Sequence, residues 1–466
     1  MKNTSRRNFL KKTSLSAAAI AASPLIPSCH NSQTQVSSSG GKYMGDFIAP
    51  KLDKVRIAFI GVGNRGSSHL KYFSGLSGAE VVAISDLYED NVNDKLKIVK
   101  QSANSNQHPR IQTYWGSEII WKAMLNEVKP DAVFISTNWK NHASMAIESM
   151  KSGAHAFVEV PLATSIKDLW SIVDTSERTQ RHCMMMENVN YGRTELMYLN
   201  MCRNGLIGDF LHAEAAYIHE LRWQMSEVDR GTGSWRTPYY AHGKGNLYPT
   251  HGLGPVAQYM SLARGGDNFK SLISYSSPAL GRAFHAKKNF TDGHKWNQLD
   301  YKNGDMNTSI IKTVMGRTIM VQWDETSPRP YTRLNLIQGT KGILAGFPAR
   351  IAIEGGFDGL SEDHHEWIQG NQLEKVYEKY DHPLYKRLNK TTEISGHGGM
   401  DGIMRHRIIE CLQKGLSLDQ NVYEGAFWSA VTELSGHSVD QDGAPQQFPD
   451  FTRGSWKSTK PLGIIN

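Results

Sequence analysis

Cysteine is scarce in this sequence of 466 residues, which contains only four. One of them, Cys29, lies in a leader-like N-terminal segment, and the other three show neither the CxxC nor the Cys/His spacing of a zinc site. Because a free cysteine usually behaves as a small buried side chain, we expect Cys183 in the apolar run C-M-M-M to be a buried thiol. We expect no disulfide and no bound metal.

An excess of charge is also missing once the N-terminus is set aside. The formal net charge is +7, but residues 1–30 contain five lysines and arginines and no acid, which leaves +2 for residues 31–466. No basic stripe and no arginine-rich helix remains in the sequence. Since nucleic-acid binding depends on a basic surface, we exclude nucleic acid as a partner.

A long hydrophobic run is absent from the N-terminus as well. The run S-A-A-A-I-A-A-S at 16–23 is shorter than the roughly 20 apolar residues that a spanning helix requires. It follows S-R-R-N-F-L-K-K at 5–12, which is typical of a twin-arginine export signal. That route exports proteins already folded, often with a cofactor inside. We therefore expect the twin-arginine export machinery as a partner and the periplasm or cell envelope as the destination.

The leader ends in L-I-P-S-C, whose last residue is Cys29. Two outcomes stay open, namely cleavage before Cys29 with attachment of a lipid anchor, or plain cleavage nearby without one. The residues that follow are polar and rich in serine and glycine, as a flexible tether is.

A glycine-rich motif follows the first predicted strand. Residues 54–66 read K-V-R-I-A-F-I-G-V-G-N-R-G, and a helical stretch and a second strand ending at Asp86 come next. In such a unit the glycines let the backbone approach a pyrophosphate, and an acid about 20 residues further on binds the ribose 2′-hydroxyl. Because an acid there repels a 2′-phosphate, the sequence predicts NAD and not NADP.

Strands and helices keep alternating up to residue 190, which predicts a doubly wound parallel sheet. Beyond it, strands of period-two alternation with glycine turns predict an α+β half with a largely antiparallel sheet. The chain is too long for one ordinary core, so two domains are expected. The predicted division is a signal peptide at 1–29, a tether at 30–52, an NAD-binding Rossmann domain at 53–190 and an α+β substrate domain at 191–466. The sequence leaves a homo-oligomer open.

The stretch 246–255, N-L-Y-P-T-H-G-L-G-P, is predicted to be a loop that precedes a helix. Its glycines and prolines give it a fixed path, so it can aim Tyr248 and His251 at a ligand. Arg236 and Tyr331 are polar candidates on flanking segments.

The run S-T-N-W-K-N-H-A-S-M-A-I-E-S-M-K-S-G-A-H-A-F-V-E-V-P resembles a segment shared by glucose–fructose oxidoreductase, inositol dehydrogenase and MocA relatives. In that superfamily the strand normally ends Glu-Lys-Pro, and its lysine serves the redox chemistry at the substrate hydroxyl. Here Val160 stands in place of the lysine, and an apolar side chain cannot move that proton. The resemblance therefore implies the superfamily fold without its usual dehydrogenase chemistry.

Further motifs resemble glycoside hydrolase family 109, whose NAD-dependent members are α-N-acetylgalactosaminidases. They are M-M-E-N-V-N-Y, Y-P-T-H-G-L-G-P, G-H-G-G-M-D, W-S-A-V-T-E-L-S-G-H-S-V and F-P-D-F-T-R-G-S-W. The resemblance implies cofactor contacts at Asn64, Arg65, Asp86, Trp139, Lys140, Asn141, His142, Glu159, Val160 and Asn188. It implies sugar contacts at Tyr217, Arg236, Tyr248, Pro249, Thr250, His251 and Tyr331. Lys140 and Asn141 depart from the family's pattern, which reads Trp-Glu-Trp-His at this segment.

The resemblance also implies a redox-neutral mechanism of oxidation, elimination and addition, in which a terminal α-N-acetylgalactosamine is oxidised at C3, loses its C2 proton and its C1 substituent, and then adds water. His251 is our candidate for proton transfer at the sugar hydroxyl, since imidazole titrates near working pH. Tyr248 or Tyr217 is the candidate C2 base, provided that a cation such as Arg236 lowers the phenol pKa. Two alternatives stay open, a periplasmic sugar oxidoreductase with tightly bound NAD(P) and a non-catalytic sugar-binding protein.

Overall fold

The computed structural model describes residues 41–357, 359–361, 365–392 and 395–466. The predicted export signal, Cys29 and the first part of the predicted tether lie outside these residues. Within the described ranges no helix is long and apolar enough to cross a membrane.

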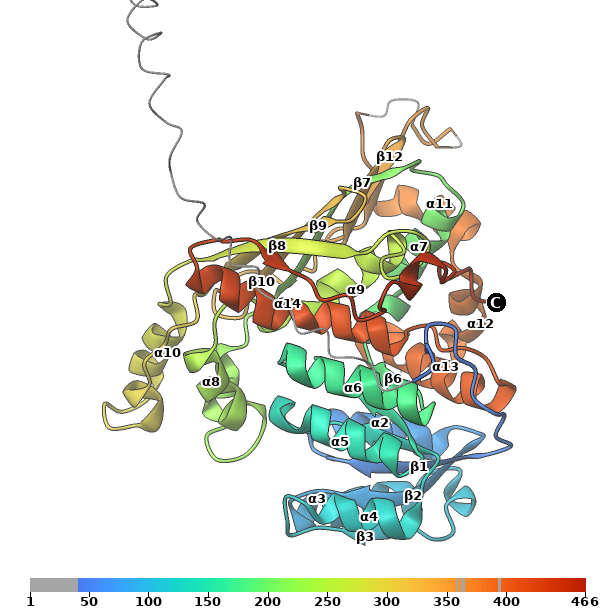
Figure 1. The fold of residues 1–466 in the computed structure, drawn as a ribbon, viewed down its shortest axis with the longest axis vertical. Helices are drawn as coiled ribbons and strands as arrows, with labels where there is room; N and C mark the ends of the chain where they lie inside the picture. Colours follow the sequence, from blue (N-terminus) through green and yellow to red (C-terminus); the bar gives the residue numbers. More distant parts are fainter. Residues whose placement is uncertain (1–40, 358, 362–364, 393–394) are drawn as a thin grey trace, which may run out of the picture. The chain divides into compact units, whose positions relative to one another are not determined.

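The first sheet is parallel and has the strand order β3-β2-β1-β4-β5-β6, which confirms the predicted doubly wound fold. Its central strands are apolar and buried on both faces, as parallel strands covered by helices are (Figure 1). The strands are β1 (Val55–Ile60), β2 (Ala79–Ser85), β3 (Gln112–Tyr114), β4 (Ala132–Ile135), β5 (His155–Val158) and β6 (Cys183–Met185). The helices between them are α2 (Asn64–Gly75), α3 (Glu89–Lys100), α4 (Ile120–Val128), α5 (Trp139–Lys151) and α6 (Ile166–Thr179).

The second sheet has nine strands in the described residues, in the order β14-β13-β12-β11-β7-β10-β9-β8-β15. Every pair is antiparallel except β7 with β10, which confirms the predicted, largely antiparallel sheet. The strands are β7 (Phe210–Ile218), β8 (Phe269–Ser276), β9 (Asn307–Thr313), β10 (Thr318–Asp324), β11 (Leu336–Gly339), β12 (Gly342–Ala345), β13 (Arg350–Ile353), β14 (Ile368–Gln369) and β15 (Gln446–Gln447). The accompanying helices are α7 (Arg193–Arg203), α8 (Thr232–His242), α9 (Thr250–Tyr259), α10 (Gly281–Asn289), α11 (Leu373–Tyr380), α12 (Pro383–Thr392), α13 (Met400–Lys414) and α14 (Val422–Asp440).

Helices α13 and α14 connect the two sheets. Helix α13 packs its buried side chains Ile403, Met404 and Ile408 into the core that also holds strand β1 of the first sheet. Helix α14 lies between α6 and β8 and touches both (Figure 1). The predicted domain division at residue 190 stays a prediction. After residue 400 the chain returns to the first sheet, where α13 covers part of one face.

The loop predicted at 246–255 is wrong from Thr250 onward, because helix α9 begins there. The glycines that suggested a loop serve close packing. A Cβ on Gly252 would lie 2.3 Å from the backbone nitrogen of Ala216 in β7, and one on Gly254 would lie 3.0 Å from the Glu187 side chain. These glycines therefore let α9 approach the second sheet and the end of the first.

Candidate active site

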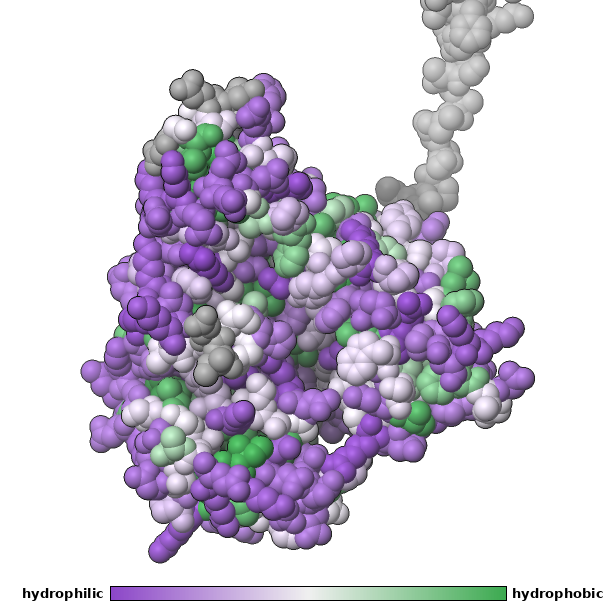
Figure 2. Space-filling view, turned by 180° about the vertical axis from the view of Figure 1, so that it is seen from behind, coloured by the Kyte–Doolittle hydropathy of each residue, from purple (hydrophilic) through white to green (hydrophobic). Residues whose placement is uncertain are grey.

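A single cleft of about 1220 Å³ collects most of the predicted site residues. Its walls come from the carboxyl ends of the first sheet's strands, from the segment 217–236, from α9 and from the turn before α13. Figure 2 shows that one face of the molecule is hollowed near its middle, with a mostly hydrophilic rim. The cleft exceeds the 300–1,000 Å³ usual for one small ligand, so it has room for a dinucleotide and part of a second molecule.

The cofactor end of this cleft is built around β1, at the point where the strand order reverses. A Cβ on Gly66 would lie 2.0 Å from the Gly61 carbonyl oxygen, whereas one on Gly63 would meet nothing within 4 Å. Gly66 thus permits tight packing, and Gly63 leaves an open cradle for a pyrophosphate. Asp86 lies beyond β2 and accepts hydrogen bonds from the backbone N–H groups of Val62 and Tyr88, which fixes the glycine-rich turn.

Of the ten predicted cofactor residues, nine line the cleft and one does not. The nine are Asn64, Arg65, Asp86, Trp139, Asn141, His142, Glu159, Val160 and Asn188. The exception, Lys140, is exposed outside it. Both ring nitrogens of His142 lie within hydrogen-bond distance of backbone carbonyls, those of Pro161 and Thr137, so its polar atoms are engaged by the protein. The glycine cradle and these polar side chains fit NAD.

Five of the predicted sugar residues also line the cleft, namely Tyr217, Arg236, Tyr248, His251 and Tyr331. The other two, Pro249 and Thr250, are buried behind it, at the start of α9. The rings of Tyr217 and Tyr248 lie 4.7 Å apart, and each lies about 5 Å from the ring of His251. The predicted catalytic side chains therefore form one aromatic cluster.

The lowered phenol pKa expected for the two tyrosines is not found. Burial raises the pKa of Tyr217 and of Tyr248 well above the usual range, and the nearby Arg236 guanidinium opposes this without reversing it. The guanidinium carbon lies 5.3 Å from the Tyr248 ring centre. Both phenols are therefore protonated. For either of them to act as a base, a neighbouring group must accept the phenol's own proton.

Such a partner exists for Tyr217 and was missed from the sequence. Its hydroxyl lies 2.9 Å from Nδ1 of His219, which also lines the cleft. Burial lowers the pKa of His219, so its imidazole is neutral and its Nδ1 can accept the hydrogen bond of the Tyr217 hydroxyl. His219 directly follows β7, two positions after Tyr217. No local sequence motif distinguishes it.

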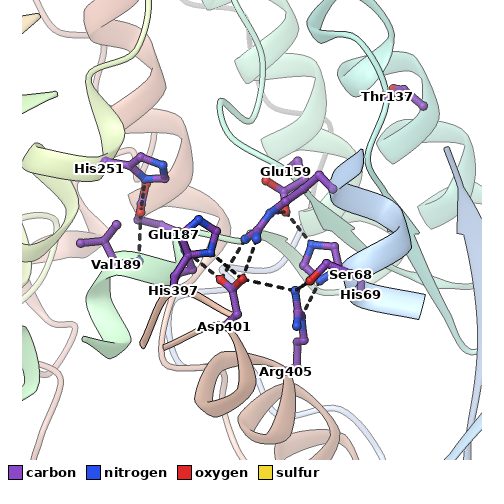
Figure 3. Close-up of polar contacts among 12 residues, drawn as sticks. Ser68, His69, Thr137, Glu159, Glu187, Val189, His251, His397, Asp401 and Arg405 are labelled. Atoms are coloured by element: carbon purple, nitrogen blue, oxygen red, sulfur yellow. Dashed lines mark hydrogen bonds and ion pairs between the residues drawn. The ribbon is translucent and has the colours of Figure 1, made fainter. Parts of the chain in front are cut away.

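Glu187 is the second residue that the sequence analysis missed. Its carboxylate is completely buried at the end of β6, and its Oε1 accepts a 2.6 Å hydrogen bond from Nδ1 of His251 (Figure 3). This bond places the proton on Nδ1 and leaves Nε2 as an acceptor, which is the tautomer that a general base needs. Glu187 Oε2 is buried and has no partner within the described residues. The motif M-M-E-N-V-N contained this residue, but only its neighbour Asn188 was selected.

A network of buried charges joins the cofactor end of the cleft to α13 (Figure 3). Arg65 donates to Glu159 and, with two nitrogens, to Asp401 at 2.6 and 3.0 Å. Asp401 also accepts from Asn188, at 2.7 Å. Burial alone would raise the pKa of Glu159, but the Arg65 guanidinium and the hydrogen bond to His69 together outweigh it and lower the pKa to about 2. The described residues contain no group of His, Cys, Asp or Glu side chains suited to hold a metal ion.

Comparison with known proteins agrees with this geometry. Residues 55–187 match the family model "Oxidoreductase family, NAD-binding Rossmann fold", and residues 191–458 match "Glycosyl hydrolase 109, C-terminal domain". The fold and cleft thus define a Rossmann-type NAD-binding protein with an added sugar-enzyme domain. The chain belongs to glycosyl hydrolase family 109, which confirms the resemblance, the NAD cofactor and the glycosidase class.

Two relatives illustrate how close the similarity is. The chain is 57% identical to glycosyl hydrolase family 109 protein 1 of Akkermansia muciniphila, with 99% of each chain covered. It is 53% identical to an α-N-acetylgalactosaminidase of Shewanella oneidensis over the full length of both. Among solved structures, levoglucosan dehydrogenase in complex with NADH and L-sorbose shares the fold, with a TM-score of 0.63, 14% identity and coverage of 86% of this chain and 100% of that one.

The Glu187–His251 bond yields the first prediction. Replacing Glu187 by Gln keeps the shape but can present an N–H to Nδ1, which no longer fixes the required tautomer. We expect Glu187→Gln to lower kcat about 10²–10⁴-fold with little change in bound NAD. The matched control is Glu177→Gln, a buried carboxylate that accepts from Tyr423 and Arg453 away from the cleft. A Glu187→Gln enzyme as active as this control would contradict the assignment.

Proposed function

We propose that the protein is an NAD-dependent α-N-acetylgalactosaminidase that releases terminal α-linked N-acetylgalactosamine from glycans. The observation that carries the proposal is the shared cleft, which is lined both by the dinucleotide residues and by His251, whose ring is held by the buried Glu187. The name of the Shewanella oneidensis relative supports this choice of sugar. Val160 supports a glycosidase over a sugar oxidoreductase, because it stands where the oxidoreductases of the superfamily have lysine.

Bound NAD supplies reversible hydride acceptance at C3 of the sugar. The chain's own residues supply the proton transfers. His251, oriented by Glu187, takes the proton of the sugar hydroxyl at Nε2 and later returns it. Tyr217 removes the C2 proton, which a C3 ketone acidifies, and His219 receives the phenol proton through Nδ1. Arg236 orients sugar oxygens, since its Nε is buried at the cleft wall without a partner in the described part of the chain.

The test of this function follows the hydrogen at C2. Hydrolysis of 4-nitrophenyl α-N-acetylgalactosaminide in D₂O should place deuterium at C2 of the released sugar, because the proton taken from C2 exchanges with solvent through His219. Direct displacement at C1 breaks no C2–H bond and leaves no label. Mass spectrometry and NMR of the product measure the label.

An oxidoreductase would give a different product, a keto-glycoside with the glycosidic bond intact. Release of unlabelled sugar would therefore reject the elimination route, and absence of release would reject the glycosidase. The matching β-linked and N-acetylglucosamine substrates serve as controls for the sugar and the anomer.

We also propose that the protein is exported folded, with NAD inside, to the periplasm or cell envelope. The support is the motif S-R-R-N-F-L-K-K together with the redox-neutral reaction, which needs no cytoplasmic pool to regenerate the cofactor. Attachment of a lipid at Cys29 remains one form of this proposal.

Export predicts that replacing both Arg6 and Arg7 by Lys leaves the protein in the cytoplasm, while the native chain appears in the envelope fraction with bound NAD. The location is measured by cell fractionation and the NAD by assay of the denatured supernatant. The variant Lys11→Arg/Lys12→Arg, which keeps the charge next to the pair, is the control. Unchanged export of the Arg6/Arg7 variant would contradict this route.

A further inference from the structure

The turn before α13 brings a histidine to the cofactor end of the cleft that no earlier assignment uses. His397 and Met400 line the cleft beside Arg65 and Asn188. The His397 side chain is 62% exposed, whereas the carboxylate that holds it, Asp401, is 1% exposed. His397 lies more than 200 positions beyond β6, the last strand of the first sheet, and still lines the cleft.

Asp401 fixes the protonation of the His397 ring. Nδ1 of His397 lies 2.8 Å from Oδ2 of Asp401 (Figure 3). Burial alone would raise the pKa of Asp401, and the hydrogen bonds from His397 and Arg65 outweigh it and hold the pKa well below its usual range. An ionised carboxylate can only accept, so Nδ1 carries the proton. In the neutral ring, Nε2 is then an acceptor that suits a hydroxyl and not a phosphate oxygen.

The backbone at this turn is held in an unfavourable conformation. His397 has a φ of 48°, and its neighbours Gly396, Gly398 and Gly399 have φ values of 103°, 67° and 93°. Glycine adopts such angles freely, whereas histidine does so at a cost. Backbone strain of this kind at a residue that also lines a cleft supports a functional role for that residue.

The order of the first sheet decides which half of the dinucleotide lies next to His397. A dinucleotide spans the crevice at the strand-order reversal, with its adenosine ribose at the acid that follows β2. That acid is Asp86, so the nicotinamide half lies on the other side of β1, over β4, β5 and β6. His397 is bonded through Asp401 to Asn188, which follows β6, and through Arg65 to Glu159, which follows β5.

We propose that His397 is a cofactor-binding residue whose Nε2 accepts a hydrogen bond from a hydroxyl of the nicotinamide ribose. The turn 396–401 then forms a wall that slows release of the dinucleotide from the cleft. The proposal rests on the NAD-binding domain and not on the identity of the sugar, so it is testable without any glycoside.

The experiment compares two displacing ligands on the purified, NAD-loaded protein. ADP-ribose contains the distal ribose and ADP does not. The variant is His397→Gly, because glycine removes the ring and still favours the observed backbone. We expect it to raise the dissociation constant of ADP-ribose about two- to tenfold relative to native protein, the worth of one neutral hydrogen bond, when that constant is obtained from displacement of radiolabelled NAD and corrected for the weaker binding of NAD itself. Displacement by ADP should not change once the result is corrected for the weaker NAD.

Release of labelled NAD into excess unlabelled NAD should accelerate by a similar factor. The control is His437→Ala, which removes a histidine paired with Glu433 four positions away on a helix outside the cleft. Equal weakening of ADP-ribose and ADP would assign His397 a merely structural part, and unchanged binding of both would remove it from the cofactor site. Either result overturns the proposal.

Discussion

The hydrogen bond between the Glu187 carboxylate and the His251 ring joins the two sheets at the cleft. Glu187 follows β6 of the first sheet by two residues, and His251 lies in the first turn of α9, which packs against β7 of the second. A completely buried carboxylate is costly unless it is hydrogen-bonded, and a hydrogen bond to such a charged group contributes about 1.5–3 kcal/mol. The same contact therefore links the first sheet to the second at the cleft and fixes the tautomer of His251.

At the cofactor end of the cleft, Asp401 likewise joins separate parts of the chain through hydrogen bonds. It accepts hydrogen bonds from side chains of α2, of the segment after β6 and of the turn before its own helix. Because α13 also completes the apolar core around β1, the polar network and the core hold the same helix. The glycine-rich turn, the segment after β6 and the start of α13 are consequently joined by one network of hydrogen bonds and ion pairs centred on Asp401.

The sequence predicted those features whose signals are local. The strand, glycine motif and acid of the first domain are close along the chain, and the periodicity of β7, β9 and β10 is visible in each strand. The start of α9 was missed because its glycines serve packing against Ala216, a contact that only the fold creates. Glu187, His219 and His397 were missed for a related reason, since their significance comes from partners or cleft walls that no spacing rule describes. The prediction that Arg236 lowers the phenol pKa of Tyr248 was wrong, because burial raises that pKa by more than the guanidinium lowers it.

A redox-neutral glycosidase differs from a conventional one in needing the hydroxyl at C3. Removal of that hydroxyl takes away the ketone, and with it the acidity of the C2 proton, while it leaves the glycosidic bond and the leaving group unchanged. The most direct measurement is thus the release of 4-nitrophenol from the 3-deoxy analogue of 4-nitrophenyl α-N-acetylgalactosaminide. The account predicts that this compound is not cleaved and that it inhibits cleavage of the parent glycoside. Release at a rate near that of the parent would contradict the account.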